Sequence, residues 1–83
     1  MLWNKLLPEE KRKLAFLLHN VKVLSRKKKT SGFQRLVMRK QTIRILQILG
    51  KEEPTNDMIA QAVSVISGSW PFKTWRLKKL IYG

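Results

Sequence analysis

The chain has 83 residues, of which 18 are lysine or arginine and 5 are aspartate or glutamate, so its formal net charge at pH 7 is +13. Its hydrophobic fraction of 43% is typical of a folded protein, and its length predicts one domain with a thin core and no deep substrate cavity. The chain contains no cysteine, which excludes disulfide bonds, thiolate metal sites and thiol catalysis.

The first predicted element is a helix over residues 8–24. Pro8 suits the first helical position because its φ is already helical, and the two glutamates after it oppose the positive end of the helix dipole. Leucine and valine recur at three- and four-residue spacing and form one apolar stripe, made of Leu14, Leu17, Leu18, Val21 and Leu24. Phe16 and Val23 fall on the opposite, basic face, which predicts a contact with a partner or another helix.

A run of four cations, Arg26-Lys27-Lys28-Lys29, separates this helix from the next one. Because like charges repel one another, we expect this connector to be solvated or held against an anion. Ser31 and Gln34 have the spacing of a capping box, which predicts a second helical region over residues 32–49 that Gly50 ends.

The second helical region has an irregular apolar pattern. Its helical apolar positions are Phe33, Leu36, Val37, Ile43, Leu46 and Leu49. The stripe slips near Thr42, where the pattern allows either one bent helix or a new helix that Thr42 caps.

A third helix is predicted after Pro54, with Thr55 or Asn56 as its cap and Asp57 in its first turn. Its residues that face one way are Met58, Ile59, Ala62 and Ile66. Ser67-Gly68-Ser69 ends it.

A fourth helix is predicted over residues 70–82, with Pro71 near its start. Its inner stripe consists of Trp70, Leu77, Leu80 and Ile81. The residues that project outward are Phe72, Trp75, Arg76, Lys79 and Tyr82. The expected fold class is therefore all-α, a small bundle of three to four helices.

Residues suited to catalysis or metal binding are scarce. His19 is the one histidine, and the five carboxylates lie at the ends of predicted elements. Neighbouring glutamates in a helix point about 100° apart, so they do not converge on a substrate or a metal ion. We predict that the protein is not an enzyme and that it uses no metal and no cofactor.

The distribution of charge is more informative than its total. Residues 11–51 contain 13 lysines and arginines and no aspartate or glutamate. Surfaces of soluble proteins normally mix both signs, and an unopposed positive surface repels itself. Phosphate groups would relieve that repulsion and release counterions, so this segment predicts a polyanionic partner.

Residues 44–60, Arg-Ile-Leu-Gln-Ile-Leu-Gly-Lys-Glu-Glu-Pro-Thr-Asn-Asp-Met-Ile-Ala, resemble the opening of a winged helix-turn-helix DNA-binding domain. Ile59-Ala60 fits the small-residue position where two helices of that family approach closely, Ser67-Gly68-Ser69 fits the turn, and residues 73–81 resemble the recognition helix. The interval from Ala60 to the last helix is a few residues longer than in the ordinary motif.

The resemblance covers residues 42–83 and implies a helix-turn-helix without a complete wing. On this interpretation the domain divides into residues 1–30, which hold the first helix and the basic connector, and residues 31–83, which hold the helix-turn-helix-like part. Arg76 and Lys79 project outward from the last helix, where arginine suits guanine or phosphate contacts and lysine supplies charge.

The predicted nucleic-acid-binding residues combine the basic connector with cations of the second and fourth helices. They are Arg26, Lys27, Lys28, Lys29, Arg35, Arg39, Lys40, Lys73, Arg76 and Lys79. Phe72 and Trp75 are the candidates for base stacking or for a partner contact.

The leading hypothesis is a small DNA-binding protein, a regulator of transcription or an accessory factor, that contacts the phosphate backbone. The first alternative is an RNA- or ribosome-associated protein, since short lysine-rich helical chains also lie along RNA. The second is an adaptor or inhibitor that docks on an acidic protein partner with Phe16, Val23 and Trp75 as anchors. The third is a membrane-surface protein with an apolar N-terminus.

No apolar run approaches the roughly 20 residues that cross a bilayer, and the N-terminus lacks the pattern of a secretory signal. We therefore expect a cytoplasmic protein. A helix-turn-helix protein that reads a symmetric site is naturally a dimer, but no sequence feature here specifies the oligomeric state.

Overall fold

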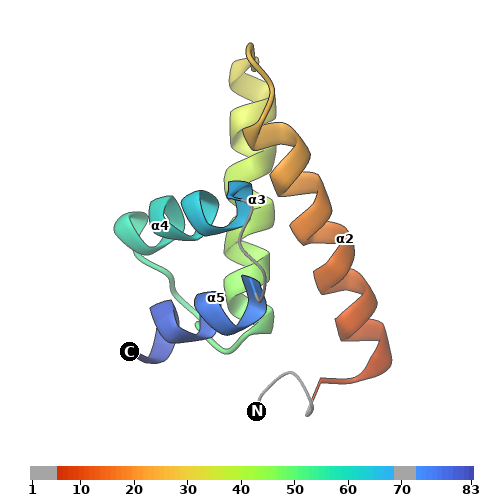
Figure 1. Ribbon diagram of the computed structural model, residues 1–83, viewed down its shortest axis with the longest axis vertical. Helices are drawn as coiled ribbons and strands as arrows, with labels where there is room; N and C mark the ends of the chain where they lie inside the picture. Colours follow the sequence, from red (N-terminus) through yellow and green to blue (C-terminus); the bar gives the residue numbers. More distant parts are fainter. Residues whose placement is uncertain (1–5, 69–72) are drawn as a thin grey trace.

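The computed structural model describes residues 6–68 and 73–83, and these residues form helices and no strand (Figure 1). The helices are α2 (Pro8–Ser25), α3 (Gly32–Ile48), α4 (Asn56–Ser67) and α5 (Lys73–Tyr82). The expected all-α bundle is thus confirmed. The Cα radius of gyration is 12.1 Å, close to the value of about 12 Å for a compact chain of this length.

The helices pack around one hydrophobic core. α2 and α3 form an antiparallel hairpin joined at the top of Figure 1, α4 lies across α3, and α5 lies beneath α4. α2 packs against both α3 and α4, whereas α5 packs mainly against α4. The buried core residues come from every helix, and they are Leu14, Leu17, Val21, Ile45, Leu46, Leu49, Ile59, Ala62, Ile66 and Leu77.

Local hydrogen bonds set the helix boundaries where the sequence predicts them. Ser31 Oγ accepts from the Gln34 backbone N–H at 3.1 Å, while Gln34 Oε1 accepts from the Ser31 backbone N–H at 3.1 Å, which completes the capping box. Thr55 caps α4, because its Oγ1 accepts from the Met58 backbone N–H at 3.2 Å. This bond decides between the two predicted caps.

Gly50 ends the second helix with a left-handed turn. Its φ is 116°, a conformation that glycine adopts without steric cost. The Lys51 backbone N–H donates to the Leu46 carbonyl at 2.8 Å, and the Gly50 N–H donates to the Gln47 carbonyl at 3.1 Å. These bonds form a Schellman motif, so the predicted stop is confirmed.

The irregular stripe of the second helical region belongs to one continuous helix. Thr42 does not cap a new helix: its side chain is fully buried, and its Oγ1 donates to the Met38 carbonyl at 2.7 Å. Thr42, Ile45, Leu46 and Leu49 lie at i, i+3, i+4 and i+7 and form the buried face. The apolar residues alone do not reveal this stripe, because it includes a threonine. Inside a helix, a threonine hydroxyl can donate a hydrogen bond to a backbone carbonyl of the preceding turn and can therefore be buried.

Two apolar side chains of α3 are exposed, contrary to their place in the predicted pattern. Phe33 is 74% exposed and Leu36 is 48% exposed. The first turns of α3 extend beyond the level of α4, so α4 does not cover this end of α3 (Figure 1). Ile43 packs at the edge of the core instead.

The last two helices match the predicted inner faces in part. Ile59, Ala62 and Ile66 are buried, but Ala60 is exposed. Of the pair Ile59-Ala60, which the helix-turn-helix resemblance places where two helices approach closely, Ile59 therefore faces the core and Ala60 faces solvent, while Ala62 is the small residue in the core. In α5, Leu77 is buried, while Leu80 and Ile81 are half-buried and Trp70 lies outside the described residues.

Candidate nucleic-acid interface

Most basic residues of the segment without acids point into solvent. Of the 13 cations in residues 11–51, three are half-buried, namely Lys11, Lys22 and Lys51. The other ten are exposed, and they are Arg12, Lys13, Arg26, Lys27, Lys28, Lys29, Arg35, Arg39, Lys40 and Arg44. These exposed cations keep the hydration that an ammonium or guanidinium group requires, so they can bind a large anion at the surface.

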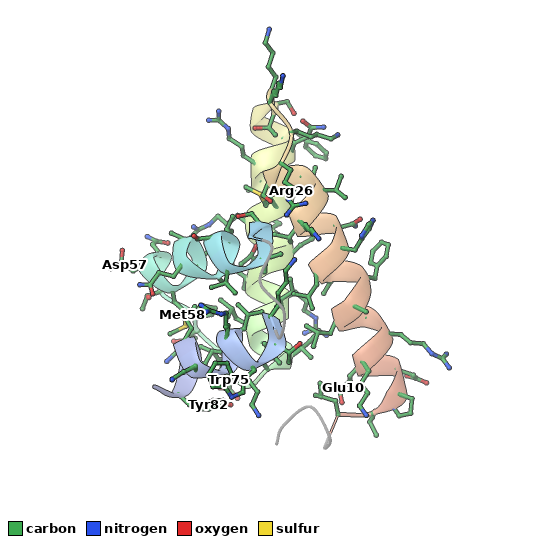
Figure 2. The ribbon with its side chains drawn as sticks, in the orientation of Figure 1. Glu10, Arg26, Asp57, Met58, Trp75 and Tyr82 are labelled. Atoms are coloured by element: carbon green, nitrogen blue, oxygen red, sulfur yellow. The ribbon has the colours of Figure 1, made fainter. Side chains whose placement is uncertain are left out.

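The closed end of the α2–α3 hairpin concentrates these charges. We call residues 22–36 the hairpin tip; its cations are Lys22, Arg26, Lys27, Lys28, Lys29 and Arg35, and it contains no acid. In Figure 2, Glu10 lies at the other end of α2, and Asp57 lies at the end of α4 that is remote from Arg26. The molecule is therefore polarised, with a purely positive tip.

Two hydrogen bonds join the connector of the tip to its helices. α2 continues into the basic run, since the Arg26 backbone N–H donates to the Lys22 carbonyl at 3.2 Å. Across the connector, Arg35 Nε donates to Thr30 Oγ1 at 3.3 Å. These bonds lie at the two ends of the connector, where it joins α2 and α3.

The predicted cations do not form one surface. Arg39 lies beside α4, where its Nη2 donates to Asn56 Oδ1 at 2.6 Å, and Lys40 is exposed on α3. Arg76 is half-buried, in a surface hollow that it lines together with Trp75, Lys79, Leu80 and Val65. Arg76 therefore lies beside the exposed Trp75 and Lys79, and Val65 of α4 borders it on the other side.

Lys73, in the first turn of α5, lies near cations at the end of α2. Burial lowers the pKa of Lys73 most, followed by the charge of Lys22, a hydrogen bond between the two side chains and the charge of Arg26. Arg26 Nε also donates to the Ser67 carbonyl oxygen, at the end of α4, at 3.1 Å. The fold thereby brings three cations together from α2 and α5.

Lys22 is the residue of this group that the sequence analysis missed. Lys22 lies in the last turn of α2 and Arg26, four residues later, is the C-cap of α2 with helical dihedral angles, so the helical period places them on one face. That spacing is a signal available in the sequence, but nothing in the sequence points to Lys73 as their neighbour. We refer to Lys22, Arg26 and Lys73 as the cation cluster.

The outer face of α5 carries two aromatic residues and two lysines. Trp75, Lys78, Lys79 and Tyr82 lie at i, i+3, i+4 and i+7 and line one shallow hollow. Trp75 is 51% exposed, and Lys79 Nζ lies 4.9 Å from the centroid of its ring, within the range of a cation–π contact. Figure 2 shows Trp75 and Tyr82 on α5, well away from Arg26. Phe72, the other stacking candidate, lies outside the described residues.

Tyr82 links this face to the core helix α3. Its hydroxyl donates to the Leu49 carbonyl oxygen at 2.9 Å, although its ring is 58% exposed. The tyrosine therefore stabilises the position of α5, while its ring remains accessible beside Trp75.

Phe16 and Val23 are exposed on α2, as expected from the helical projection. The opposite face of α2, with Leu14 and Val21, packs into the core. Phe16 and Val23 thus point away from the bundle, whereas Trp75 belongs to the outer face of α5. These three predicted protein anchors do not form one contiguous patch.

Comparisons with known proteins found no relative that could indicate what this surface binds. No family model matches the chain, and no significantly similar curated protein or solved structure was found. The resemblance of residues 42–83 to a helix-turn-helix domain stays a prediction. In the part of the chain that the structure describes, no helix combines the length and apolar character needed to span a bilayer.

Proposed function

We propose that this protein binds nucleic acid through contacts to the phosphate backbone, with duplex DNA as the first candidate. The observation that carries the proposal is the hairpin tip, which presents five exposed cations, Arg26 to Lys29 and Arg35, and contains no acid. A surface of one sign costs stability through self-repulsion. A polyanion removes this cost and releases its condensed counterions on binding.

The distribution of the remaining cations favours an extended ligand over one compact acidic patch. Basic residues lie at the tip, along α3 and on α5, and the longest dimension of the molecule is 36 Å. One turn of a DNA duplex is about 34 Å long and carries phosphates along its whole length. A duplex is therefore long enough to span the molecule and to contact those cations that share the face on which it lies.

A single-stranded nucleic acid, including RNA, is the second candidate because of Trp75. Its half-exposed ring lies beside Lys79 on an open face of α5. Stacking of a base on such a ring contributes about 1–3 kcal/mol, and it requires a base that is not paired within a duplex.

The test measures the affinity of the full chain for a duplex, a single strand and a structured RNA as a function of salt concentration. The logarithm of the binding constant falls with the logarithm of salt with a slope of about −0.9 for each phosphate contact on duplex DNA. The five exposed tip cations therefore predict a slope of about −4 to −5 if each contacts one phosphate. A slope near zero contradicts the proposal, and a clear preference for structured RNA moves RNA to first place.

Two double variants with the same net charge show whether the tip is the binding surface. Lys27→Gln with Lys28→Gln removes two cations from the tip, and we expect the slope to become shallower by about 2. Arg12→Gln with Lys13→Gln removes two exposed cations at the other end of α2 as the matched control. Equal losses in both variants would show that binding follows total charge and not the tip.

A further inference from the structure

The outer face of α5 presents an aromatic ring whose partner in the free protein is a lysine side chain. Lys79 Nζ lies 4.9 Å from the centroid of the Trp75 ring, and Trp75 is 51% exposed. The lysine ammonium is carried on a flexible four-carbon stem, so it can leave the ring without a change in the backbone. At an exposed site a cation–π contact is also weaker than the stacking of a base on an aromatic ring. A planar ligand can therefore replace this contact.

Two shallow hollows adjoin at Trp75 and Lys79. The first has a volume of about 320 Å³ and is lined by these two residues together with Lys78 and Tyr82. The second has a volume of about 430 Å³ and extends from the same two residues toward Val65 of α4. Both volumes are at the lower end of the range of about 300–1,000 Å³ that is usual for small-molecule sites. Such open hollows suit one group of a larger ligand.

Tyr82 bounds the first hollow, and a hydrogen bond to the core helix α3 fixes its position. Its hydroxyl donates to the Leu49 carbonyl oxygen at 2.9 Å, while its ring remains 58% exposed. Because the hydroxyl is already held, a contact with this ring loses little conformational entropy. Trp75 and Tyr82 lie two helical turns apart on one face of α5, with Lys78 and Lys79 between them along the helix.

The charge of α5 determines which kind of ligand suits this face. The helix contains no aspartate or glutamate, and its cations are Lys73, Arg76, Lys78 and Lys79. An unpaired nucleotide carries both a base with a π face and a negatively charged phosphate. Aromatic rings interleaved with cations match these two groups, which is the combination that proteins use to bind single strands.

We propose that the outer face of α5 binds one unpaired nucleotide of a nucleic-acid strand. The base stacks on Trp75, Tyr82 bounds the site, and Lys79 moves from the ring to the phosphate of the same nucleotide, where Lys78 adds charge. The site rests on the function proposed above and assigns separate residues to the base and to the phosphate. A base within a duplex is covered by its neighbours in the stack, so this site selects an unpaired base.

The experiment compares two probes that carry the same phosphates, a short oligothymidylate and an abasic strand of equal length. Their affinities for the full chain are measured at one salt concentration. Stacking of one base predicts that the native chain binds the oligothymidylate about 5- to 150-fold more tightly than the abasic strand. Equal affinities would overturn the site, because no base would then be recognised.

Variants of Trp75 test the assignment of the base. Trp75→Ala is expected to abolish the preference for the oligothymidylate and to leave the affinity for the abasic strand unchanged, because no charge is removed. Trp75→Phe retains an aromatic ring and should keep part of the preference. The helical circular dichroism signal checks that both variants remain folded. A full preference in folded Trp75→Ala would show that the base binds elsewhere and would overturn the site.

A variant of Lys79 tests the assignment of the phosphate. Lys79→Met should weaken the binding of both probes and reduce the magnitude of the single-strand salt slope by about 0.7, the value for one phosphate contact. Unchanged affinity for both probes would show that Lys79 does not contact a phosphate and would overturn its role.

Phe16→Ala is the matched control for Trp75→Ala. Phe16 is an aromatic residue of α2 that is 61% exposed and lies outside the proposed site. The preference for the oligothymidylate is expected to survive in Phe16→Ala. Equal loss in the two variants would refute the site, because it would show that any exposed ring contributes.

The outcomes also separate this site from the proposed function. If a blunt duplex binds with a steep salt slope but the two single-stranded probes bind equally, the site is wrong and the function stands. If the preference for the oligothymidylate depends on Trp75 but the duplex does not bind, the site stands and duplex DNA is not the ligand. If none of the three probes binds, both are wrong, and the aromatic face of α5 is left as a contact for a protein.

Discussion

Leu77→Ala should detach α5 from the bundle without unfolding the other helices. Leu77 is fully buried, whereas the other apolar residues of α5 that pack on the core, Leu80 and Ile81, are half-buried. Replacing a buried leucine by alanine costs about 2–5 kcal/mol. A domain of this size has a free energy of unfolding of about 4–12 kcal/mol. The loss caused by Leu77→Ala is therefore a large fraction of the total stability.

The local consequence follows from the length of the helix. α5 has 10 residues, and isolated helices shorter than about 12–15 residues are marginal in water. After the loss of Leu77, the contact from Tyr82 to the Leu49 carbonyl contributes only about 1 kcal/mol. We therefore expect the helix to open independently of α3.

Native-state hydrogen exchange measures this opening residue by residue. In Leu77→Ala, a loss of at least about 2 kcal/mol corresponds to a decrease of roughly 30-fold in the protection of residues 73–82. Residues 42–49 of α3 should keep most of their protection. The matched variant Leu80→Ala removes a half-buried leucine from the same helix and should have a smaller effect.

Two results would contradict this prediction. Equal loss of protection in α3 and α5 would refute the reasoning, because it would show that α5 opens only with the whole bundle. Unchanged protection of α5 would show that Leu77 is not its anchor.

Two further predictions concern α5. Trp75→Ala should weaken binding of a single strand by about 1–3 kcal/mol per stacked base and leave the salt slope unchanged, as measured by fluorescence titration; a changed slope with unchanged affinity at low salt would argue against stacking. The pH dependence of stability tests Lys73, whose pKa is lowered in the folded state by burial, by Lys22 and by Arg26. Between this lowered pKa and 10.5, Lys73 is protonated in the unfolded chain and deprotonated in the folded chain. The free energy of unfolding should therefore rise with pH across that window. Below the window Lys73 is protonated in both states, and its unfavourable environment destabilises the folded protein to the full extent. Urea unfolding at several pH values should show this rise in the native chain relative to Lys73→Met; parallel profiles would contradict it.

The helices and their ends were predictable because local interactions determine them. Pro8 begins α2, the reciprocal bonds of Ser31 and Gln34 begin α3, and Gly50 ends it with the left-handed turn that few other residues adopt. Each signal acts within a few residues of its own position, so it can be recognised without knowledge of the fold. The same holds for the stretch without acids, since charge order along a chain is a property of the sequence.

Which face of a helix becomes buried depended on the neighbours that the bundle supplied. Phe33 and Leu36 look like core residues, but α3 extends past α4 at that level and leaves them exposed. Thr42 looks like a cap, but the core accepts it because its hydroxyl bonds to the Met38 carbonyl. Helical periodicity specifies which residues share a face, whereas only packing decides which face meets another helix.

The sequence by itself determined that this protein is helical, strongly basic and free of acids along residues 11–51, because propensity, capping and charge are local properties. Only the tertiary structure decided that Lys73 would lie beside Lys22 and Arg26, since these residues are far apart in the chain and are brought together by the docking of α5. The burial of Leu77 drives that docking and places like charges together, which is the physical reason why the cation cluster could not be recognised from the order of residues.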